Sequence, residues 1–161
     1  MKRSRMRAGA TLATFGVLLV LTCGALANSA RPLVVNEILE PVSGASSTID
    51  LYMSRLGTYY AELYLERDGV AAAPPVAVST GVKFTFLRGE EVLLERDVVA
   101  AFDPGQPATT LLLLDVPRDL PQRKALAMVV TVHDVDPVLG ETAANLRLQL
   151  TRKVQLSPLR R

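Results

Sequence analysis

Residues 82–99, VKFTFLRGEEVLLERDVV, place the tightest constraint on how this chain can fold. Apolar and polar side chains alternate from Val82 to Phe86, which is the period of a strand with one buried face. Arg88-Gly89-Glu90 interrupts the alternation, and a second apolar row resumes at Val92. Two such runs joined by a short break that contains glycine predict an antiparallel hairpin. Because a lone hairpin is unstable in water, the rest of the chain must supply strands that cover its apolar face.

Six further segments are predicted as strands from their alternation or their apolar runs, the first of them as an edge strand. They are Arg31–Glu40, Thr48–Met53, Thr58–Arg67, Thr109–Val116, Lys124–Val135 and Ala144–Val154. Between the third strand and the hairpin, Val70–Pro75 cannot form a central strand, because its two prolines lack amide donors. We interpret that segment as a crossover between two sheets.

The residue patterns of two predicted strands are also compatible with a helix. Thr58–Arg67 is rich in Ala, Glu and Leu, which favour helices, but its alternation and the Asp68-Gly69 turn signal that follows favour a strand. Thr109–Val116 contains four consecutive leucines. That run fits a strand buried on both faces, and it also fits the core of a helix.

Short strands at regular spacing with turn signals between them predict an all-β fold. We expect an immunoglobulin-like β-sandwich of about seven or eight antiparallel strands, with no helix beyond the N-terminal leader. The cysteines and tryptophan that mark antibody domains are absent from the predicted domain, so the strand order stays open. An eight-stranded barrel is the alternative.

The first 27 residues are predicted to be a signal peptide. Basic residues from Lys2 to Arg7 precede the uncharged stretch Ala8–Leu21, and Ala25-Leu26-Ala27 matches a small-x-small cleavage site. Cleavage there would start the mature chain at Asn28. We therefore expect an exported protein of the periplasm.

Two alternatives would hold the chain at a membrane. The uncharged stretch Ala8–Ala30 is long enough to span a bilayer if it stays uncut. Bacterial lipoproteins carry lipid on a cysteine that follows a short apolar segment, and Cys23 follows Val20-Leu21-Thr22. Such segments usually end in a smaller residue than Thr22, such as Gly or Ala. Membrane contact is expected only in these two cases, and cleavage after Ala27 is favoured.

Without residues 1–27, the chain is predicted to comprise a β-sandwich domain at 28–154 and a flexible tail at 155–161. The leader takes four of the 18 basic residues and none of the 16 acidic ones, so 14 against 16 gives a net charge of −2. The densest basic runs are then Arg123-Lys124 and Arg160-Arg161, so nucleic-acid binding is not expected. Cys23 is the only cysteine, and its removal excludes a disulfide.

The sole histidine, His133, is the most reactive candidate residue. With Asp134 and Asp136 it could seed a metal site, because imidazole and carboxylate groups ligate zinc or calcium. On a strand, however, His133 and Asp134 point to opposite faces, and a structural role is favoured. No serine lies in a G-x-S-x-G elbow, and Ser79-Thr80-Gly81 is interpreted as a turn. We therefore assign no catalytic, cofactor-binding or metal residue.

Three tyrosines form the most suggestive predicted surface. Tyr52, Tyr60 and Tyr64 fall on the polar rows of two predicted strands. If those strands pair, the three rings lie together on one sheet face, and tyrosine is enriched at protein interfaces. The favoured alternative is that the rings lie on a covered face or pack across strands to stabilise the sheet.

The order of these features resembles an uncharacterised family of small exported β-sandwich proteins of proteobacteria, a domain of unknown function often found as lipoproteins. The resemblance rests on Gly57-Thr58-Tyr59-Tyr60-Ala61-Glu62-Leu63, on the Phe-rich hairpin with Val92 and Val98-Val99, and on Asp134-Val135-Asp136-Pro137-Val138-Leu139. It covers Ile49 to Leu150. Where such domains often have Gly-x-Tyr entering the late strand, this chain has Lys124-Ala125-Leu126. The resemblance implies the fold and export, and it implies no activity.

The sequence therefore predicts a non-enzymatic binding module of the bacterial envelope whose partner is an unknown envelope protein. Unpaired edge strands, with the segments near Val34 and Leu148 as candidates, would let a partner add a strand. A carrier of a small apolar ligand is the alternative. A metal-dependent enzyme that uses His133, Asp134 and Asp136 is the third hypothesis.

Overall fold

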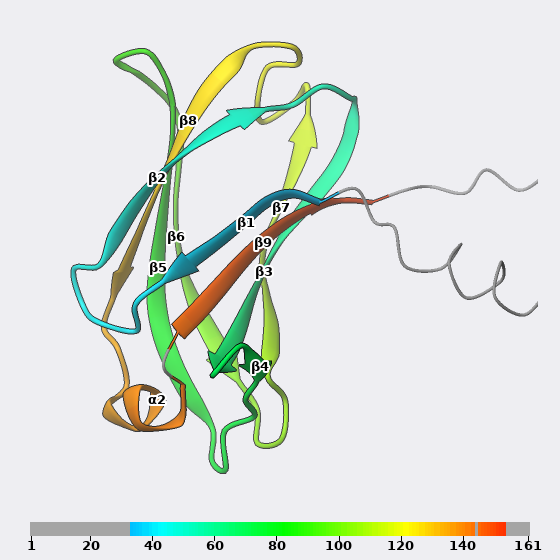
Figure 1. The fold of residues 1–161 in the computed structure, drawn as a ribbon. Helices are drawn as coiled ribbons and strands as arrows, with labels where there is room; N and C mark the ends of the chain where they lie inside the picture. The colour runs from blue at the N-terminus through cyan, green and yellow to red at the C-terminus, as the bar shows by residue number, and fades with distance from the viewer. Residues whose placement is uncertain (1–32, 144, 154–161) are drawn as a thin grey trace, which may run out of the picture. The chain divides into compact units, whose positions relative to one another are not determined.

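A computed structural model describes residues 33–143 and 145–153, which belong to the compact unit Arg31–Arg161. The predicted signal peptide at 1–27, Cys23 and the predicted tail at 155–161 lie outside the described residues. The described part contains nine strands and one short helix (Figure 1). They are β1 (Leu33–Leu39), β2 (Ser46–Tyr52), β3 (Gly57–Arg67), β4 (Val70–Ala71), β5 (Val78–Arg88), β6 (Glu91–Phe102), β7 (Ala108–Val116), β8 (Ala125–His133), α2 (Pro137–Thr142) and β9 (Asn145–Arg152).

The strands form two antiparallel sheets that pack face to face. Sheet A has the order β1-β9-β3, and both β7 and the two-residue β4 pair with the other side of β3. Sheet B has the order β2-β8-β5-β6. The predicted β-sandwich is therefore confirmed, and the two sheets do not close into the alternative barrel.

The strand order, which the sequence left open, is that of a jelly roll. Leaving β4 aside, the orders β1-β9-β3-β7 and β2-β8-β5-β6 are those of two Greek keys that share both sheets. Along the chain, these eight main strands are joined by seven connections. Six of them cross from one sheet to the other, and the seventh, β5–β6, is a hairpin within sheet B. Residues that are distant in the sequence thus become neighbours within each sheet.

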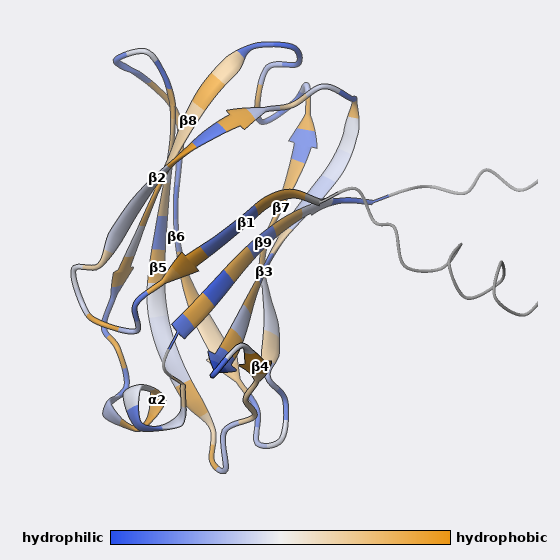
Figure 2. Cartoon of the chain, in the orientation of Figure 1, coloured by the Kyte–Doolittle hydropathy of each residue, from blue (hydrophilic) through white to orange (hydrophobic). Residues whose placement is uncertain are grey.

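The core lies between the sheets and consists of one apolar row from each strand. Figure 2 shows the resulting alternation of hydrophobic and hydrophilic residues along β9. In β5 the side chains of Phe84 and Phe86 have no exposed surface, and their ring centroids lie 6.4 Å apart. In β8 the predicted row Leu126, Met128, Val130 and Val132 is buried.

The predicted hairpin is confirmed as β5 and β6. Val82 pairs with Val98 and Lys83 pairs with Asp97, and the two strands are longer than the sequence pattern indicated. The turn consists of Gly89, with φ of +62°, and Glu90. A positive φ at the first turn residue costs glycine nothing, which explains why the break in the pattern falls there.

The segment Thr58–Arg67 is a strand, as favoured. Its buried row includes Tyr59, Ala61, Leu63 and Leu65. The phenol of Tyr59 donates a hydrogen bond of 2.7 Å to the carbonyl of Arg55, so this polar group is satisfied although the ring is buried.

The structure corrects the expectation that no helix follows the leader. Helix α2 begins after Asp136, whose carboxylate accepts a hydrogen bond of 2.9 Å from the amide of Val138. An Asp N-cap followed by proline in the first turn is a standard start signal for a helix. In the sequence, Pro137 and Gly140 had suggested only the end of a strand.

Strand β7 is not buried on both faces, as its leucine run suggested. It pairs with β3 alone, so it is an edge strand, and Leu113 on its outer face is 65% exposed. The other edges are β1 in sheet A and β2 and β6 in sheet B. The prediction of an edge near Val34 in β1 is confirmed, whereas the prediction near Leu148 is wrong, because β9 pairs with neighbours on both sides.

Two loop predictions also change. Val70–Pro75 begins with β4, which pairs with β3 across the turn at Asp68 and Gly69 before the chain crosses to sheet B. Ser79-Thr80-Gly81 lies within β5 rather than in a turn, because each of its residues pairs with β6. Among the described residues there is no helix long and apolar enough to cross a membrane.

Two leucines of sheet A offer a matched test of this architecture. Leu148→Ala should lower the free energy of unfolding by about 2–5 kcal/mol, because Leu148 has no exposed surface. Leu113→Ala makes the same chemical change at a 65% exposed position and should cost less than about 0.5 kcal/mol. Urea denaturation of both variants measures the difference. Equal losses would contradict the placement of Leu148 in the core and of Leu113 on the outer face of β7.

Candidate functional site

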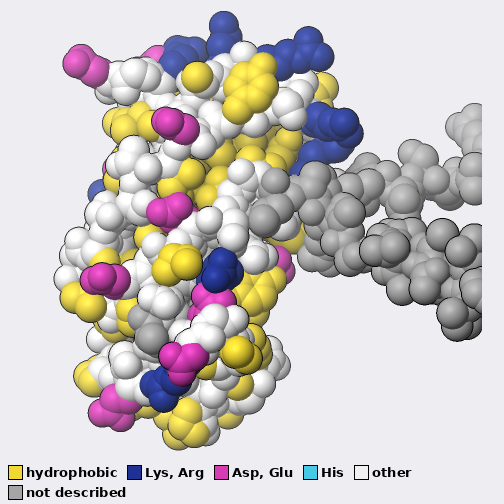
Figure 3. Space-filling model, in the orientation of Figure 1, with side chains coloured by type: hydrophobic (Ala, Val, Ile, Leu, Met, Phe, Trp, Pro, Cys, Tyr) yellow, Lys and Arg dark blue, Asp and Glu magenta, His cyan; other side chains and the backbone are white. Residues whose placement is uncertain are grey.

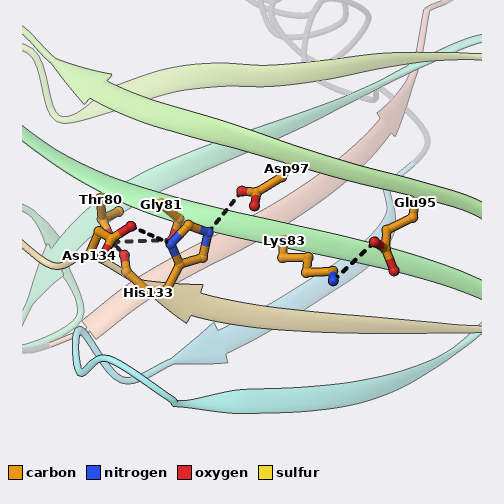
Figure 4. Close-up of polar contacts among 7 residues, drawn as sticks. All are labelled: Thr80, Gly81, Lys83, Glu95, Asp97, His133 and Asp134. Atoms are coloured by element: carbon orange, nitrogen blue, oxygen red, sulfur yellow. Dashed lines mark hydrogen bonds and ion pairs between the residues drawn. The ribbon is translucent and has the colours of Figure 1, made fainter.

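The outer face of sheet B carries a polar cluster around His133, the last residue of β8. Strand pairing sets His133 beside Gly81 of β5, and Gly81 in turn faces Val99 of β6. The imidazole leans across β5 toward β6, as Figure 4 shows. There it meets Asp97, and its side chain is 32% exposed.

Both ring nitrogens of His133 have carboxylate partners. Nε2 lies 2.8 Å from Oδ1 of Asp97, and Nδ1 lies 2.9 Å from Oδ2 of Asp134. The sequence placed His133 and Asp134 on opposite faces, which is wrong, because Asp134 is not extended. Its φ of +46° is left-handed, a conformation that Asp tolerates better than most residues, and it turns the carboxylate back toward the ring.

Glycine at position 81 makes room for the ring. A Cβ atom on Gly81 would lie 2.1 Å from Cε1 of His133, far inside van der Waals contact. The neighbouring residue Thr80 is buried, and its hydroxyl donates a hydrogen bond of 3.0 Å to the carbonyl of His133. The end of β8 is therefore held both through its backbone and through its side chain.

The two carboxylates stabilise the charged imidazolium. Hydrogen bonding to Asp134, and then to Asp97, raises the pKa of His133 above its usual value of 6.5. When the ring is protonated, each nitrogen donates its own N–H to one carboxylate, so a single positive charge interacts with both carboxylates. Lys83 and Glu95 form a separate ion pair of 3.0 Å on the same face (Figure 4).

The three residues of the predicted metal site, His133, Asp134 and Asp136, do not come together as the sequence suggested. Asp136 caps α2 instead of facing His133. Asp97, which sequence analysis did not select, takes its place beside the ring. Within the described ranges, no group of three or more His, Cys, Asp or Glu side chains is placed to hold a metal ion. The register of the β5–β6 hairpin places Asp97 opposite Lys83. His133 reaches Asp97 only because β8 pairs with the other side of β5.

The three tyrosines do not form one surface. Tyr52 ends β2 and is 57% exposed on sheet B, whereas Tyr60 and Tyr64 lie on β3 in sheet A. The hypothesis of a shared tyrosine face required β2 to pair with β3, but β2 pairs with β8.

The outer face of sheet A has a shallow depression beside its edge strand. Tyr60 of β3 pairs directly with Leu113 of β7, and the depression of about 340 Å³ lies over this pair. Its remaining lining residues are Thr58, Glu62, Thr110 and Lys153. An exposed leucine beside an aromatic ring, with charged groups at the rim, resembles the composition of a protein contact surface.

A buried ion pair lies further along the same face. The guanidinium of Arg147 on β9 contacts both carboxylate oxygens of Glu66 on β3, with Nη2 2.7 Å from Oε2. It also donates a hydrogen bond of 3.1 Å to the side-chain oxygen of Asn36 on β1. These contacts tie three adjacent strands together, and we assign them a structural role.

Comparisons with known proteins support the fold and do not extend to a function. No family model and no curated protein matches the chain. The chain is similar to a solved structure, the crystal structure of GEBA250068378 from Sulfurospirillum deleyianum. The TM-score is 0.52 at 5% identity, and the match covers 75% of this chain and 98% of the other. At this identity, the likeness is one of fold alone.

The raised pKa of His133 is directly measurable, because the chain has one histidine. A titration of its ring protons by NMR should give a pKa above 6.5, and Asp97→Asn or Asp134→Asn should lower it. The folded state binds this proton more tightly than the unfolded chain. The resulting stabilisation is therefore present below about pH 6.5 and is lost as the pH rises through the folded pKa.

Glu95→Gln is the matched control, because Glu95 pairs with Lys83 and not with the ring. It should leave the pKa of His133 near the wild-type value. A pKa at or below 6.5 in the wild-type protein would contradict the arrangement.

Gly81→Ala should displace the imidazole while the sheet persists. The new methyl group would occupy the space of the ring, which must rotate away from Asp97. We expect the pKa of His133 to fall toward 6.5, with a modest loss of stability, because a side chain rather than backbone must move. An unchanged pKa in this variant would show that the ring does not lie over Gly81.

Proposed function

We propose that this chain is an exported, non-enzymatic interaction module that contacts a protein partner in the cell envelope. The proposed contact surface is the outer face of sheet A beside β7. The observation that carries the proposal is Leu113, which is 65% exposed on an edge strand and pairs directly with Tyr60. A leucine beside a tyrosine ring on an edge strand offers a partner both an apolar contact and an available backbone edge.

The edge position of β7 favours recognition by strand addition. Among the described strands, β7 pairs only with β3 along its length, so its second edge is available to a partner. Exposed edges are commonly protected by charged side chains. Strand β7 has one, Asp115, whose carboxylate accepts a hydrogen bond of 2.7 Å from the hydroxyl of Thr58. By contrast, β6 carries Glu91, Glu95, Arg96 and Asp97.

The depression beside Leu113 would give such a contact its specificity. In strand addition, backbone hydrogen bonds supply affinity, and pockets for alternate side chains supply selectivity. A partner's apolar side chain would rest against Tyr60 and Leu113. Glu62 and Lys153 would form a polar rim of mixed charge around it.

The filled interior supports a contact module over the apolar-ligand carrier. The side chains between the sheets are closely buried, and Phe84, Phe86 and Leu63 have no exposed surface. Export is supported by the signal-like residues 1–27 and by the family resemblance, and periplasmic location remains part of the proposal.

A pull-down from detergent-solubilised native envelope tests the proposal. The tagged full-length chain should retain a stoichiometric protein that mass spectrometry identifies. Leu113→Asp should abolish retention, because a carboxylate cannot be buried in an apolar contact without a partner. Val99→Asp makes a comparable change at a 73% exposed position on β6 and should retain the protein. His133→Ala should also retain it, whereas a metal-dependent enzyme would lose bound metal or activity.

The proposal fails if no protein is retained. It also fails if Leu113→Asp and Val99→Asp behave alike.

A further inference from the structure

Six basic side chains gather at one end of the sandwich, which we call the basic end. They are Arg55, Arg118, Arg123, Lys124, Arg152 and Lys153. Arg55 lies in the β2–β3 loop, and Arg118, Arg123 and Lys124 lie in the β7–β8 loop. Arg152 is the last residue of β9, and Lys153 follows it. Figure 3 shows Lys and Arg side chains clustered at the upper end of the molecule and down its adjoining side. Five of the six are exposed, and Arg152 is half-buried.

Hydrogen bonds hold these three segments together. The amide of Arg123 donates a hydrogen bond of 3.0 Å to the carbonyl of Met53, and the side chain of Gln122 donates one of 3.1 Å to the carbonyl of Ser54. Further along the β2–β3 loop, the carbonyl of Leu56 accepts a hydrogen bond of 3.2 Å from Nε of Arg152. The basic end is therefore a built surface rather than a set of independent loops.

The cations of the basic end are not neutralised by the described part of the chain. None of the six forms an ion pair with a described carboxylate, whereas Lys83, Arg88 and Arg147 do. Two acids in and after β7, Asp115 and Asp119, are half-buried and engaged. Asp115 accepts a hydrogen bond from Thr58, and Asp119 accepts one of 2.7 Å from the amide of Asp115.

The rest of the described surface is strongly acidic. All 16 acidic residues of the chain are described, against eleven of the 18 basic ones. The β5–β6 turn, with Arg88, Glu90 and Glu91, lies at the same end in Figure 1. Together with the basic end, Asp115 and Asp119, this end therefore has seven basic and four acidic residues, which leaves four basic and twelve acidic residues elsewhere. An anionic surface would therefore attract this end and repel most of the remaining molecule.

Two large apolar side chains lie among the cations. Tyr52 at the end of β2 is 57% exposed, and Leu56 in the β2–β3 loop is 51% exposed. Tyrosine next to Lys and Arg is typical of groups that settle at the headgroup level of a bilayer. Nucleic-acid backbones would use the charge but not the exposed leucine.

The chain also enters the described domain at this end. Leu33 pairs with Thr151, the neighbour of Arg152. The amide of Lys153 donates a hydrogen bond of 2.8 Å to the carbonyl of Thr58. The uncharged stretch Ala8–Ala30 precedes Leu33 closely in the sequence. If Cys23 were lipidated, nine residues would lie between it and Leu33, and the ten steps from one Cα to the next would reach at most about 35 Å.

We propose that the basic end docks on an anionic phospholipid bilayer, with Tyr52 and Leu56 entering the headgroup region. This contact adjoins the protein contact proposed at Leu113, because Lys153 belongs to the basic end and to the rim of that depression. It would orient the domain on the membrane. Each Lys or Arg close to an anionic surface strengthens binding measurably, and salt screens the effect.

A single tryptophan reports the contact directly, because the chain has none of its own. In the full-length chain, emission of Leu56→Trp should shift to shorter wavelength on vesicles of phosphatidylcholine with 30% phosphatidylglycerol, and the shift should shrink in high salt. Val99→Trp, which sets the probe on β6 of sheet B, should not shift. This pair stays informative even when the N-terminal stretch itself inserts, because both probes share it.

Neutralisation of the basic end should remove the effect. In the Leu56→Trp background, Arg118→Gln, Arg123→Gln and Lys124→Gln together should weaken vesicle binding measured through the probe by about tenfold or more. The control triple Arg67→Gln, Lys83→Gln and Arg96→Gln makes the same charge change elsewhere and should bind like the wild type.

Three outcomes would overturn the proposal: no shift of Leu56→Trp, an equal shift of Val99→Trp, or equal losses in the two triple variants. A shift with a DNA duplex but not with the anionic vesicles would also overturn it and assign the basic end to nucleic acid. These experiments use purified protein and lipid, so their failure leaves the Leu113 contact untouched.

Discussion

The burial of one apolar row from each strand between two sheets is the interaction on which this structure depends. No strand is stable alone, and each row is covered only when the opposite sheet is in place. The fully buried phenylalanines of β5 and the leucines of β9 are parts of a single core cluster. Since side chains alternate along a strand, the same constraint sends every second residue outward, where the candidate sites lie.

The outward-facing rows differ in character between the two sheets. On sheet B, His133 bridges Asp97 and Asp134, an arrangement that fastens the end of β8 across β5 to β6. On sheet A, the Glu66–Arg147 pair fastens three strands, and the surface beyond it opens into the Tyr60–Leu113 depression. Polar contacts that are satisfied internally favour structural roles, and the exposed leucine on an edge strand favours a partner.

The two proposed contacts depend on different interactions and lie on adjoining surfaces that meet at Lys153. The face beside β7 offers an apolar side chain and an available strand edge. The basic end offers unneutralised charge with two apolar side chains among it. A domain that docks on a bilayer through its end keeps the sides of its sandwich accessible, so the two proposed contacts are compatible with each other.

Much of the fold could be predicted from the sequence because alternation is a local property. The hairpin at Val82–Val99, the β3 strand and the buried row of β8 follow from side-chain period alone. The exposed face of β7 could not be predicted, since four leucines look alike at an edge and in a centre. Helix α2 was missed because its start signal, Asp136 before Pro137, also marks the end of a strand.

Local residue patterns were sufficient to predict the main strands and most of their buried faces, and they are the basis for expecting export. Which strands lie side by side became clear only in the folded domain. That order set His133 over Gly81 and beside Asp97, and it separated Tyr52 from Tyr60. It also drew Arg55, Arg123 and Arg152 to one end. Apolar burial is not directional, so it stabilises a strand against any neighbour that covers its apolar face. Which strands pair therefore depends on the packing of the whole sandwich and not on a local pattern.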